Sequence, residues 1–211
     1  RMYNLLKILA LRHDVTLLSF IRSDEEKAYR DKFPFCRNVT MIMRGNAWQA
    51  KYILKAGFGT KPFLYATYDN ERMKSAIADE LVRDTFDLVH LEPSYVWPSL
   101  PKTDVPVVVT EHNIESTIYS GFVRSFPLVF FRPLLYVDVL KLIRWEHIVW
   151  KRADHVVTVS EPDATVVGKT ITPLHVTVVP NGVDAAQFSF KPSHGIQKKR
   201  ILFVGFFGWL Q

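Results

Sequence analysis

The sequence is poor in cysteine, and its one thiol, Cys36, cannot form an internal disulfide. A disulfide framework is excluded, so we expect a protein of the reducing cytoplasm.

No segment has the order of charged, apolar and small residues that a secretory signal shows. The most apolar stretch, residues 126–140, contains Arg132, Pro133 and Asp138. It falls short of the roughly 18 to 20 apolar residues of a spanning helix. We therefore predict no transmembrane segment, and at most a peripheral position on the inner face of the membrane.

Motifs for metal, cofactor or hydrolytic chemistry are missing too. The sequence has no Cys/His zinc spacing, no His-Glu-x-x-His, no Gly-x-Ser-x-Gly and no Gly-x-Gly-x-x-Gly after an expected strand. We expect no metal and no cofactor. The 27 Lys and Arg residues against 21 Asp and Glu give a net charge of +6, which favours anionic partners such as nucleotide diphosphates or lipid headgroups. Nucleic acid is not expected, because no RNP-like motif or long basic tract occurs.

What the sequence does contain is an alternation of strand-period and helix-period segments. Short β-rich runs occupy residues 15–20, 39–43, 87–91, 106–112, 154–160 and 175–179. Helical spacing occurs at 2–9, 23–32, 47–56 and 69–84, in two or three helices over 114–152 broken at Pro127 and Pro133, and from Glu161. This order predicts an α/β fold, a Rossmann-like parallel sheet with helices on both faces.

Several positions predict where elements end. We expect Gly57 to cap one helix, Asp69 to begin another and Asn181-Gly182 to supply the positive-φ positions of a turn. Residues 189–200 have the composition of a linker, and a new strand opens after them. The expected organisation is a domain over residues 1–188, a linker over 189–200 and the first strand of a second domain over 201–211. The chain begins with Arg1 and stops after a strand, so we expect truncation at both ends.

Four fragments in order carry a family resemblance. They are Arg1-Met-Tyr-Asn-Leu-Leu with Arg12-His-Asp-Val-Thr, Val107-Val-Val-Thr-Glu-His-Asn113, Trp145-Glu146 leading into Arg152-Ala-Asp-His-Val-Val-Thr-Val-Ser160, and Val179-Pro-Asn-Gly-Val-Asp184 with Phe188. Each fragment alone is a common pattern. Together, across the whole chain, the sequence resembles the family-4 glycosyltransferases, which are retaining enzymes of the two-domain GT-B fold.

The resemblance implies that the chain is the acceptor-side, N-terminal half of a GT-B enzyme. Such an enzyme transfers a sugar from a nucleotide-sugar donor to a carbohydrate or lipid-linked acceptor. The family's first strand and Gly-Gly loop would precede Arg1, and its donor-binding motifs would lie in the second domain, so the chain alone is expected to be inactive. Gly205 would lie on the donor side, followed by Phe206 where many members have arginine.

The candidate site residues lie at the ends of the expected strands. His112 ends a strand where open α/β sheets bind ligands, and the resemblance implies a catalytic role for it; the alternative is a histidine that orders the loop. Glu111 and Asn113 either hold the imidazole, contact acceptor hydroxyls or are merely solvated. Glu92 lines the same cleft or is a solvated turn residue. Ser160 faces the cleft or, as its sequence context favours, caps the next helix. Asn181 and Gly182 would form the hinge between domains.

Residues 126–152 combine an apolar stretch with a basic and aromatic stripe of Arg144, Trp145, Trp150, Lys151 and Arg152. This mixture is typical either of a helix on an anionic membrane surface or of a core helix with a solvated basic side. Two further functions remain open at this stage. One is a GT-B-fold nucleotide-sugar epimerase, and the other is a non-catalytic partner-binding domain.

Overall fold

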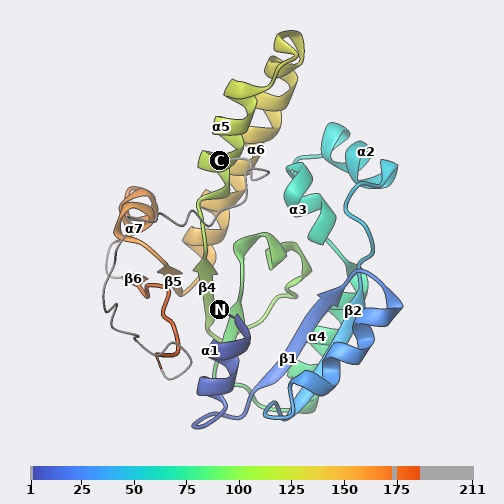
Figure 1. Cartoon of the computed structure of the whole chain (residues 1–211), viewed down its shortest axis with the longest axis vertical. Helices are drawn as coiled ribbons and strands as arrows, with labels where there is room; N and C mark the ends of the chain where they lie inside the picture. Colours follow the sequence, from blue (N-terminus) through green and yellow to red (C-terminus); the bar gives the residue numbers. More distant parts are fainter. Residues whose placement is uncertain (1, 173–174, 186–211) are drawn as a thin grey trace, which may run out of the picture.

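The computed structural model describes residues 2–172 and 175–185 as parallel β-sheet packed with helices (Figure 1). The strands in these ranges are β1 (Thr16–Ile21), β2 (Asn38–Met43), β3 (Val89–Leu91), β4 (Val107–Glu111), β5 (His155–Thr158) and β6 (Val176–Val178). They form two sheets, ordered β1–β2 and β3–β4–β5–β6, and every pairing is parallel. The predicted α/β fold with parallel sheet is confirmed.

Helices connect consecutive strands, as parallel pairing requires. They are α1 (Met2–Leu9), η1 (Asp24–Lys32), α2 (Ala50–Phe58), α3 (Phe63–Tyr68), α4 (Glu71–Arg83), η2 (Ser94–Ser99), α5 (Glu115–Ser125), η3 (Val129–Phe131), α6 (Arg132–Arg152) and α7 (Glu161–Gly168), where η denotes a 3₁₀ helix. No helix in the described ranges is long and apolar enough to cross a membrane.

The β1–β2 sheet has a helix on each face. Ile42 of β2 packs against Met73 and Ile77 of α4, whose spacing of four residues puts them on one stripe of that helix. η1 packs against both strands from the other side.

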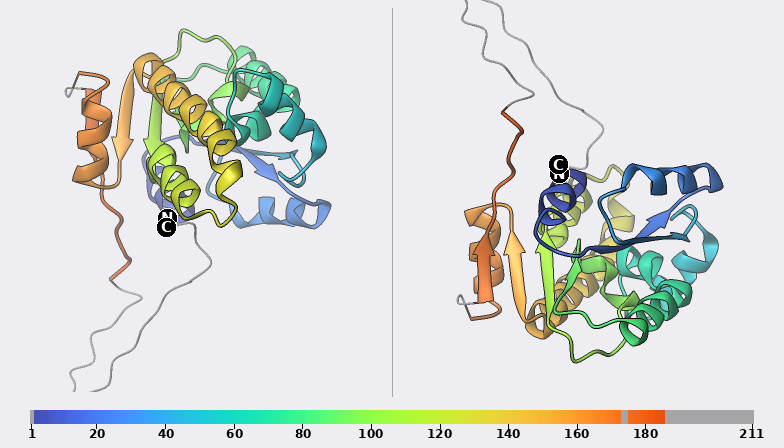
Figure 2. Two further views of the ribbon diagram at one scale, coloured as in Figure 1. Left: turned by 90° about the horizontal axis from the view of Figure 1, so that it is seen from above. Right: turned by 90° about the horizontal axis from the view of Figure 1, so that it is seen from below.

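The larger sheet is covered by α6 and α7 (Figure 2). Val107 and Val109 alternate along β4 and reach the α6 side chains Leu142 and Val149. Beside them, Val156 of β5 packs with Trp150 of α6 and Val167 of α7. This interior holds the strand ends that carry the candidate site.

Two expected helix boundaries are wrong. Gly57 lies inside α2, and the helix ends instead at Gly59, where a Cβ would come within 2.4 Å of the Lys55 carbonyl oxygen. Only glycine allows that approach. Asn70, not Asp69, caps α4, because its side chain accepts a hydrogen bond from the Met73 amide at 3.1 Å.

The helical region after β4 is divided as expected. α5 ends before Pro127, and Pro133 lies in the first turn of α6, where the missing N–H leaves no helical hydrogen bond unmade. The resulting α5–α6 hairpin projects beyond the sheets at the top of Figure 1.

The turn predicted at Asn181-Gly182 is wrong. Within the described residues only Gly45 has a positive φ, so neither Asn181 nor Gly182 adopts the conformation expected of them. Both residues are exposed. The linker 189–200 and the segment 201–211, with Gly205 and Phe206, lie outside the described residues.

Candidate functional site

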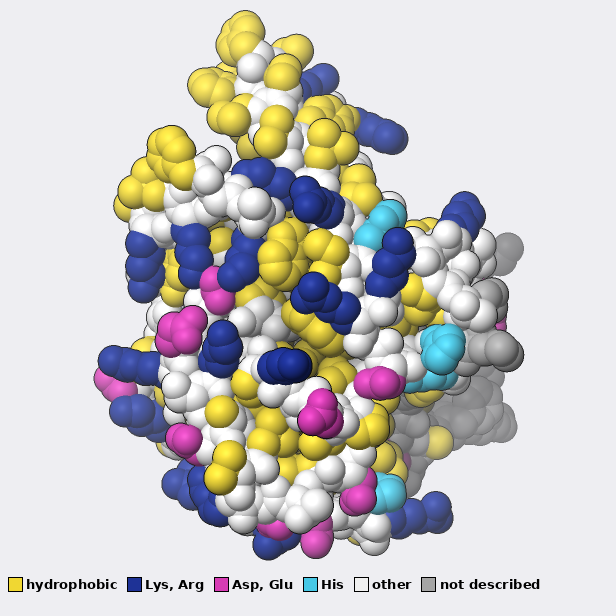
Figure 3. All heavy atoms as spheres, turned by 180° about the vertical axis from the view of Figure 1, so that it is seen from behind, with side chains coloured by type: hydrophobic (Ala, Val, Ile, Leu, Met, Phe, Trp, Pro, Cys, Tyr) yellow, Lys and Arg dark blue, Asp and Glu magenta, His cyan; other side chains and the backbone are white. Residues whose placement is uncertain are grey.

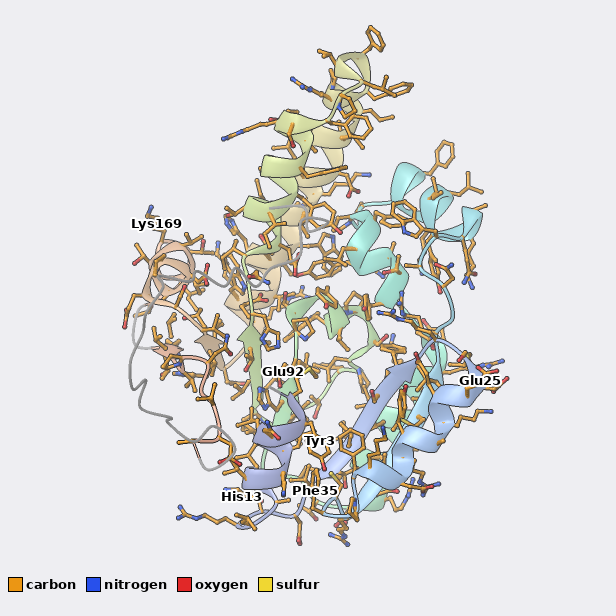
Figure 4. All side chains as sticks on the ribbon, in the orientation of Figure 1. Tyr3, His13, Glu25, Phe35, Glu92 and Lys169 are labelled. Carbon is orange, nitrogen blue, oxygen red and sulfur yellow. The ribbon has the colours of Figure 1, made fainter. Side chains whose placement is uncertain are left out.

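The carboxyl ends of β3 and β4 bring Glu92 and His112 together. Each residue directly follows its strand, and the two strands are parallel neighbours. His112 Nε2 lies 2.9 Å from Glu92 Oε1. Figure 4 shows Glu92 near the middle of the molecule, between Lys169 beside α7 and Glu25 on η1. The pair therefore lies at the sheet edge where open α/β folds bind ligands.

The pair is partly open to solvent. The His112 side chain is 29% exposed and that of Glu92 is 11% exposed, so the carboxylate is set behind the imidazole. A carboxylate on one ring nitrogen fixes the orientation of the ring. The interpretation of Glu92 as a solvated turn residue is thus wrong, since its carboxylate is largely buried and paired with His112.

Glu111 points into the interior between β4 and α6. It is 1% exposed, and its Oε1 accepts a hydrogen bond from Trp150 Nε1 at 2.7 Å. Burial raises the pKa of Glu111 to about 8, although the bonds from Trp150 and Ser94 act in the opposite direction. Glu111 is therefore an internal group that lies away from any surface an acceptor reaches.

Glu146 of α6 is a second buried carboxylate beside the first. Its Oε1 accepts from the Ser116 amide at 3.0 Å, and its Oε2 is buried without a hydrogen-bond partner. Burial raises the pKa of Glu146 to about 7. Because the first amides of a helix have no partner within the helix, Glu146 fixes the start of α5 and with it the short loop from His112.

Two further groups complete the surroundings of the pair. Burial raises the pKa of Glu115, the first residue of α5, and the proximity of His112 acts against that shift. On the other side, the Tyr65 hydroxyl bonds to Ser94 Oγ at 3.1 Å, and Ser94 also bonds to Glu111. These bonds connect α3, η2, β4 and α6 beneath the sheet edge.

The remaining sequence candidates lie in different places. Asn113 is half-buried next to His112. Ser160 caps α7, as its sequence context favoured, since its Oγ accepts from the Asp163 amide at 3.3 Å. Asn181 and Gly182 are exposed beyond β6. The structure therefore brings Glu92 and His112 together, with Asn113 next in the chain, and leaves Ser160 in a capping role.

The roles of Glu115 and Glu146 were missed by the sequence interpretation. A signal for Glu146 exists, because it follows the buried Leu142 by four residues and precedes the buried Trp150 by four. A glutamate in the middle of a buried stripe indicates a polar partner inside the protein. Within residues 2–172 and 175–185, no three metal-ligating side chains come together.

Comparison with known families identifies the chain. Residues 1–187 match the family described as Glycosyltransferase Family 4. The chain belongs to that family. A search among curated proteins finds no match to this sequence. The family is one of sugar transfer from a nucleotide-sugar donor to an acceptor, and the Rossmann-like N-terminal domain agrees with the parallel sheets described above.

Proposed function

We propose that the parent enzyme transfers a sugar from a nucleotide-sugar donor to a carbohydrate or lipid-linked acceptor with retention at the anomeric carbon. The described domain forms the acceptor side, and His112 is its catalytic residue. The observation that carries this proposal is the 2.9 Å pair between His112 and Glu92 at the carboxyl edge of the sheet. Because Nε2 lies on the carboxylate, Nδ1 remains for the substrate: the neutral ring accepts there from a sugar hydroxyl, and the protonated ring donates from there to charge that develops on the leaving phosphate.

The domain organisation of the parent follows from the same proposal. Residues 1–188 form the acceptor domain, 189–200 the linker and 201–211 the first strand of the nucleotide-sugar domain, with Gly205 on the donor side. Among the described residues, β1 pairs only with β2 and β3 only with β4, which supports an additional first strand in the parent. Since transfer takes place between two domains, this chain alone is inactive.

His112→Ala in the complete enzyme tests the catalytic assignment. We expect kcat/KM to fall on the order of 100-fold or more, because one preorganised donor is lost. Folding stability should change by less than about 1 kcal/mol, because the side chain is partly exposed. Glu92→Gln should lower kcat/KM less, since it weakens the orientation of the ring but leaves the imidazole present.

His155→Ala is the matched control. His155 bonds to Thr177 Oγ1 at 2.7 Å and lies at the amino end of β5, at the opposite edge of the sheet. Its loss should leave kcat/KM near the wild-type value. Near-normal turnover of His112→Ala, or a loss that parallels a loss of folded protein, overturns the assignment.

A peripheral membrane contact on the inner leaflet is a second proposal, and the tip of the α5–α6 hairpin supports it. Apolar side chains there are exposed to unusual extents: Leu128 50%, Val129 57%, Phe130 84%, Phe131 51% and Leu134 68%. Arg132 lies among them in the sequence, and Arg124 precedes them on α5. Figure 3 shows this apolar tip with Lys and Arg side chains below it. An exposed apolar patch with a basic border suits an anionic lipid surface.

The structure narrows the segment predicted for this contact. Trp150 is 1% exposed, and Trp145 is partly buried against the core cluster of Tyr65 and Leu142, so the two tryptophans do not form an exposed stripe. The contact is therefore assigned to residues 126–140 rather than to the whole of 126–152.

Flotation with anionic liposomes tests the tip. The chain should bind at low salt and bind less as salt screens the arginines. Phe130→Ser with Phe131→Ser should reduce the bound fraction several-fold, because buried apolar area drives insertion. Val82→Ser is the control, since Val82 is 89% exposed on α4 and far from the tip. Equal flotation of the tip variant and wild type contradicts the proposal.

A further inference from the structure

A cavity of about 310 Å³ lies between η1 and the β1–β2 sheet. It is lined by Ser19 and Met41 from the strands and by Glu26, Tyr29 and Phe33 from η1. At the carboxyl ends of the two strands it is bordered by Arg22, Arg44 and Tyr68. Its size suits one small polar ligand.

Arg44 is held in place but lacks a full set of hydrogen-bond acceptors. Its guanidinium carbon lies 4.5 Å from the centre of the Tyr68 ring. Its amide donates to the Ile21 carbonyl at 2.9 Å, and Gly45 follows at a φ of 76°. Nη1 of Arg44 is buried and has no hydrogen-bond partner. A buried donor on a charged group without an acceptor is costly, so this atom marks a place where an acceptor belongs.

The charge around the cavity is not neutralised by the protein. Within the described residues, neither Arg22 nor Arg44 has a carboxylate at salt-bridge distance. Glu26 is the one acidic residue in the lining, and its Oε2 accepts from the Arg22 amide at 2.7 Å. Two arginines and one carboxylate therefore line the cavity, which gives the lining a net positive charge.

Aromatic stacking joins this cavity to the candidate site. The Tyr68 ring contacts Phe20 at a centroid distance of 5.5 Å and Tyr95 at 4.6 Å. Tyr95 is three residues after Glu92, on η2. The guanidinium of Arg44 thus rests on the Tyr68 ring, and one neighbour of that ring, Tyr95, belongs to the segment that follows Glu92.

We propose that Arg44, with Arg22, binds an anionic group of the acceptor, a phosphate or a carboxylate. The planar guanidinium, fixed over Tyr68, presents paired N–H groups that match two oxygens of such an anion. That the anion belongs to an acceptor rests on the proposed transferase function, whereas the anion site itself does not depend on sugar transfer. It assigns the enzyme to charged acceptors rather than neutral sugars.

Arginine side-chain NMR of the chain tests the site directly, with the Nε–Hε signals followed during titration at constant ionic strength. The probes are glycerol 3-phosphate, inorganic phosphate and glucuronate. We expect a saturable shift of the Arg44 signal with at least one of them. Response to the two phosphates identifies a phosphate group, and response to glucuronate identifies a carboxylate.

Three variants decide whether the shift reports this site, and their affinities are measured through the Arg22 Nε–Hε signal, because Arg22 lines the same cavity and remains in all three. Arg44→Gln should weaken binding roughly tenfold or more, as expected when a charged hydrogen-bond donor is lost. Arg44→Lys keeps the charge but not the paired N–H groups, so it should bind several-fold more weakly than wild type, and it serves where Arg44→Gln does not fold. Arg144→Gln, an exposed arginine on α6, should bind like wild type.

Some results overturn the proposal. They are the absence of saturable binding by every probe, wild-type affinity in the Arg44 variants, or equal losses in the Arg44 and Arg144 variants. None of these measurements requires a donor sugar or turnover. A failure here therefore leaves the catalytic assignment of His112 untouched, and His112→Ala should still bind the probe.

Discussion

Two groups of acidic side chains differ in the direction of their pKa shifts: Glu111 and Glu146 behind the larger sheet, and Asp69 beside α2. Glu111 and Glu146 lie between β4 and α6, where burial raises their pKa values to about 8 and about 7. Neither forms a salt bridge within the described residues. For Asp69, burial alone would raise the pKa, but the bonds from Lys55 and Lys61 outweigh it and the pKa lies below its usual value.

The difference teaches how the two regions use acidic side chains. Glu111 and Glu146 stay protonated to far higher pH than ordinary glutamates, and they act through hydrogen bonds that position neighbouring backbone and tryptophan. Asp69 is ionised and joins α2 to the end of α3 through charge. A rise in pH therefore weakens the first region, and strong acid weakens the second.

The largest expected effect is the pH dependence of folding stability. In the folded state Glu146 keeps its proton up to about pH 7 and Glu111 up to about pH 8, whereas in the unfolded chain both ionise near pH 4.3. Stability is thus present at low pH and is lost as pH rises through this window. At about 1.4 kcal/mol per pKa unit, the combined loss should be several kcal/mol, up to about 8 kcal/mol.

Urea unfolding at pH 5, 6, 7 and 8 checks this expectation. Glu111→Gln with Glu146→Gln should flatten the decline, because neither amide titrates. Glu25→Gln, on the exposed side of η1, should leave the slope unchanged. An equally steep decline in the double glutamine variant would show that other groups cause it.

An intermediate effect is expected from Trp150→Phe. It removes the 2.7 Å hydrogen bond to Glu111 in the interior and should cost about 1–3 kcal/mol. The cost should grow at higher pH, where the carboxylate is ionised and needs the donor more. Thermal and urea unfolding measure it, with Trp145→Phe as the control, since that indole bonds to Thr60 at an exposed position. An equal loss of unfolding free energy in both tryptophan variants would show that the buried Trp150–Glu111 hydrogen bond contributes no more than the exposed one.

The smallest effect is expected from Asp69→Asn. Pairing with two lysines on a partly exposed surface should contribute about 1 kcal/mol or less at pH 7. Because the folded-state pKa is lowered, this contribution is present above the usual aspartate pKa and is lost as pH falls below it. It should also shrink in high salt. Unfolding at low and high salt measures it, and a salt-independent difference would point to packing instead of charge.

Much of the fold could be predicted because its causes are local. Met73 and Ile77 mark the buried stripe of α4, and Pro127 marks the break between α5 and α6. α3 was missed, because no helical spacing was predicted between residues 56 and 69 and the helix spans only Phe63–Tyr68, directly after Pro62. The end of α2 at Gly59 was missed too, since it depends on a close backbone contact that periodicity does not report.

The site was only half predictable for a related reason. His112 follows from its position at the end of a strand, but its partner Glu92 lies 20 residues earlier on the neighbouring strand. That register is a tertiary property. The inward direction of Glu111 was equally hidden, because a strand buried on both faces has no polar alternation to show which side each residue takes.

The length of α6 also fixes the distance between the exposed tip of the α5–α6 hairpin and the His112–Glu92 pair. The helix runs without interruption from Arg132, beside the exposed tip, to Glu146, which holds the start of α5 next to His112. At 1.5 Å per residue, these two positions are about 20 Å apart along the axis. If the tip rests on a bilayer, the sheet edge stands at a fixed height above it, and an acceptor anchored in that bilayer must span the gap. The length of the spacer between lipid and sugar would then select the acceptor before any side chain touches it.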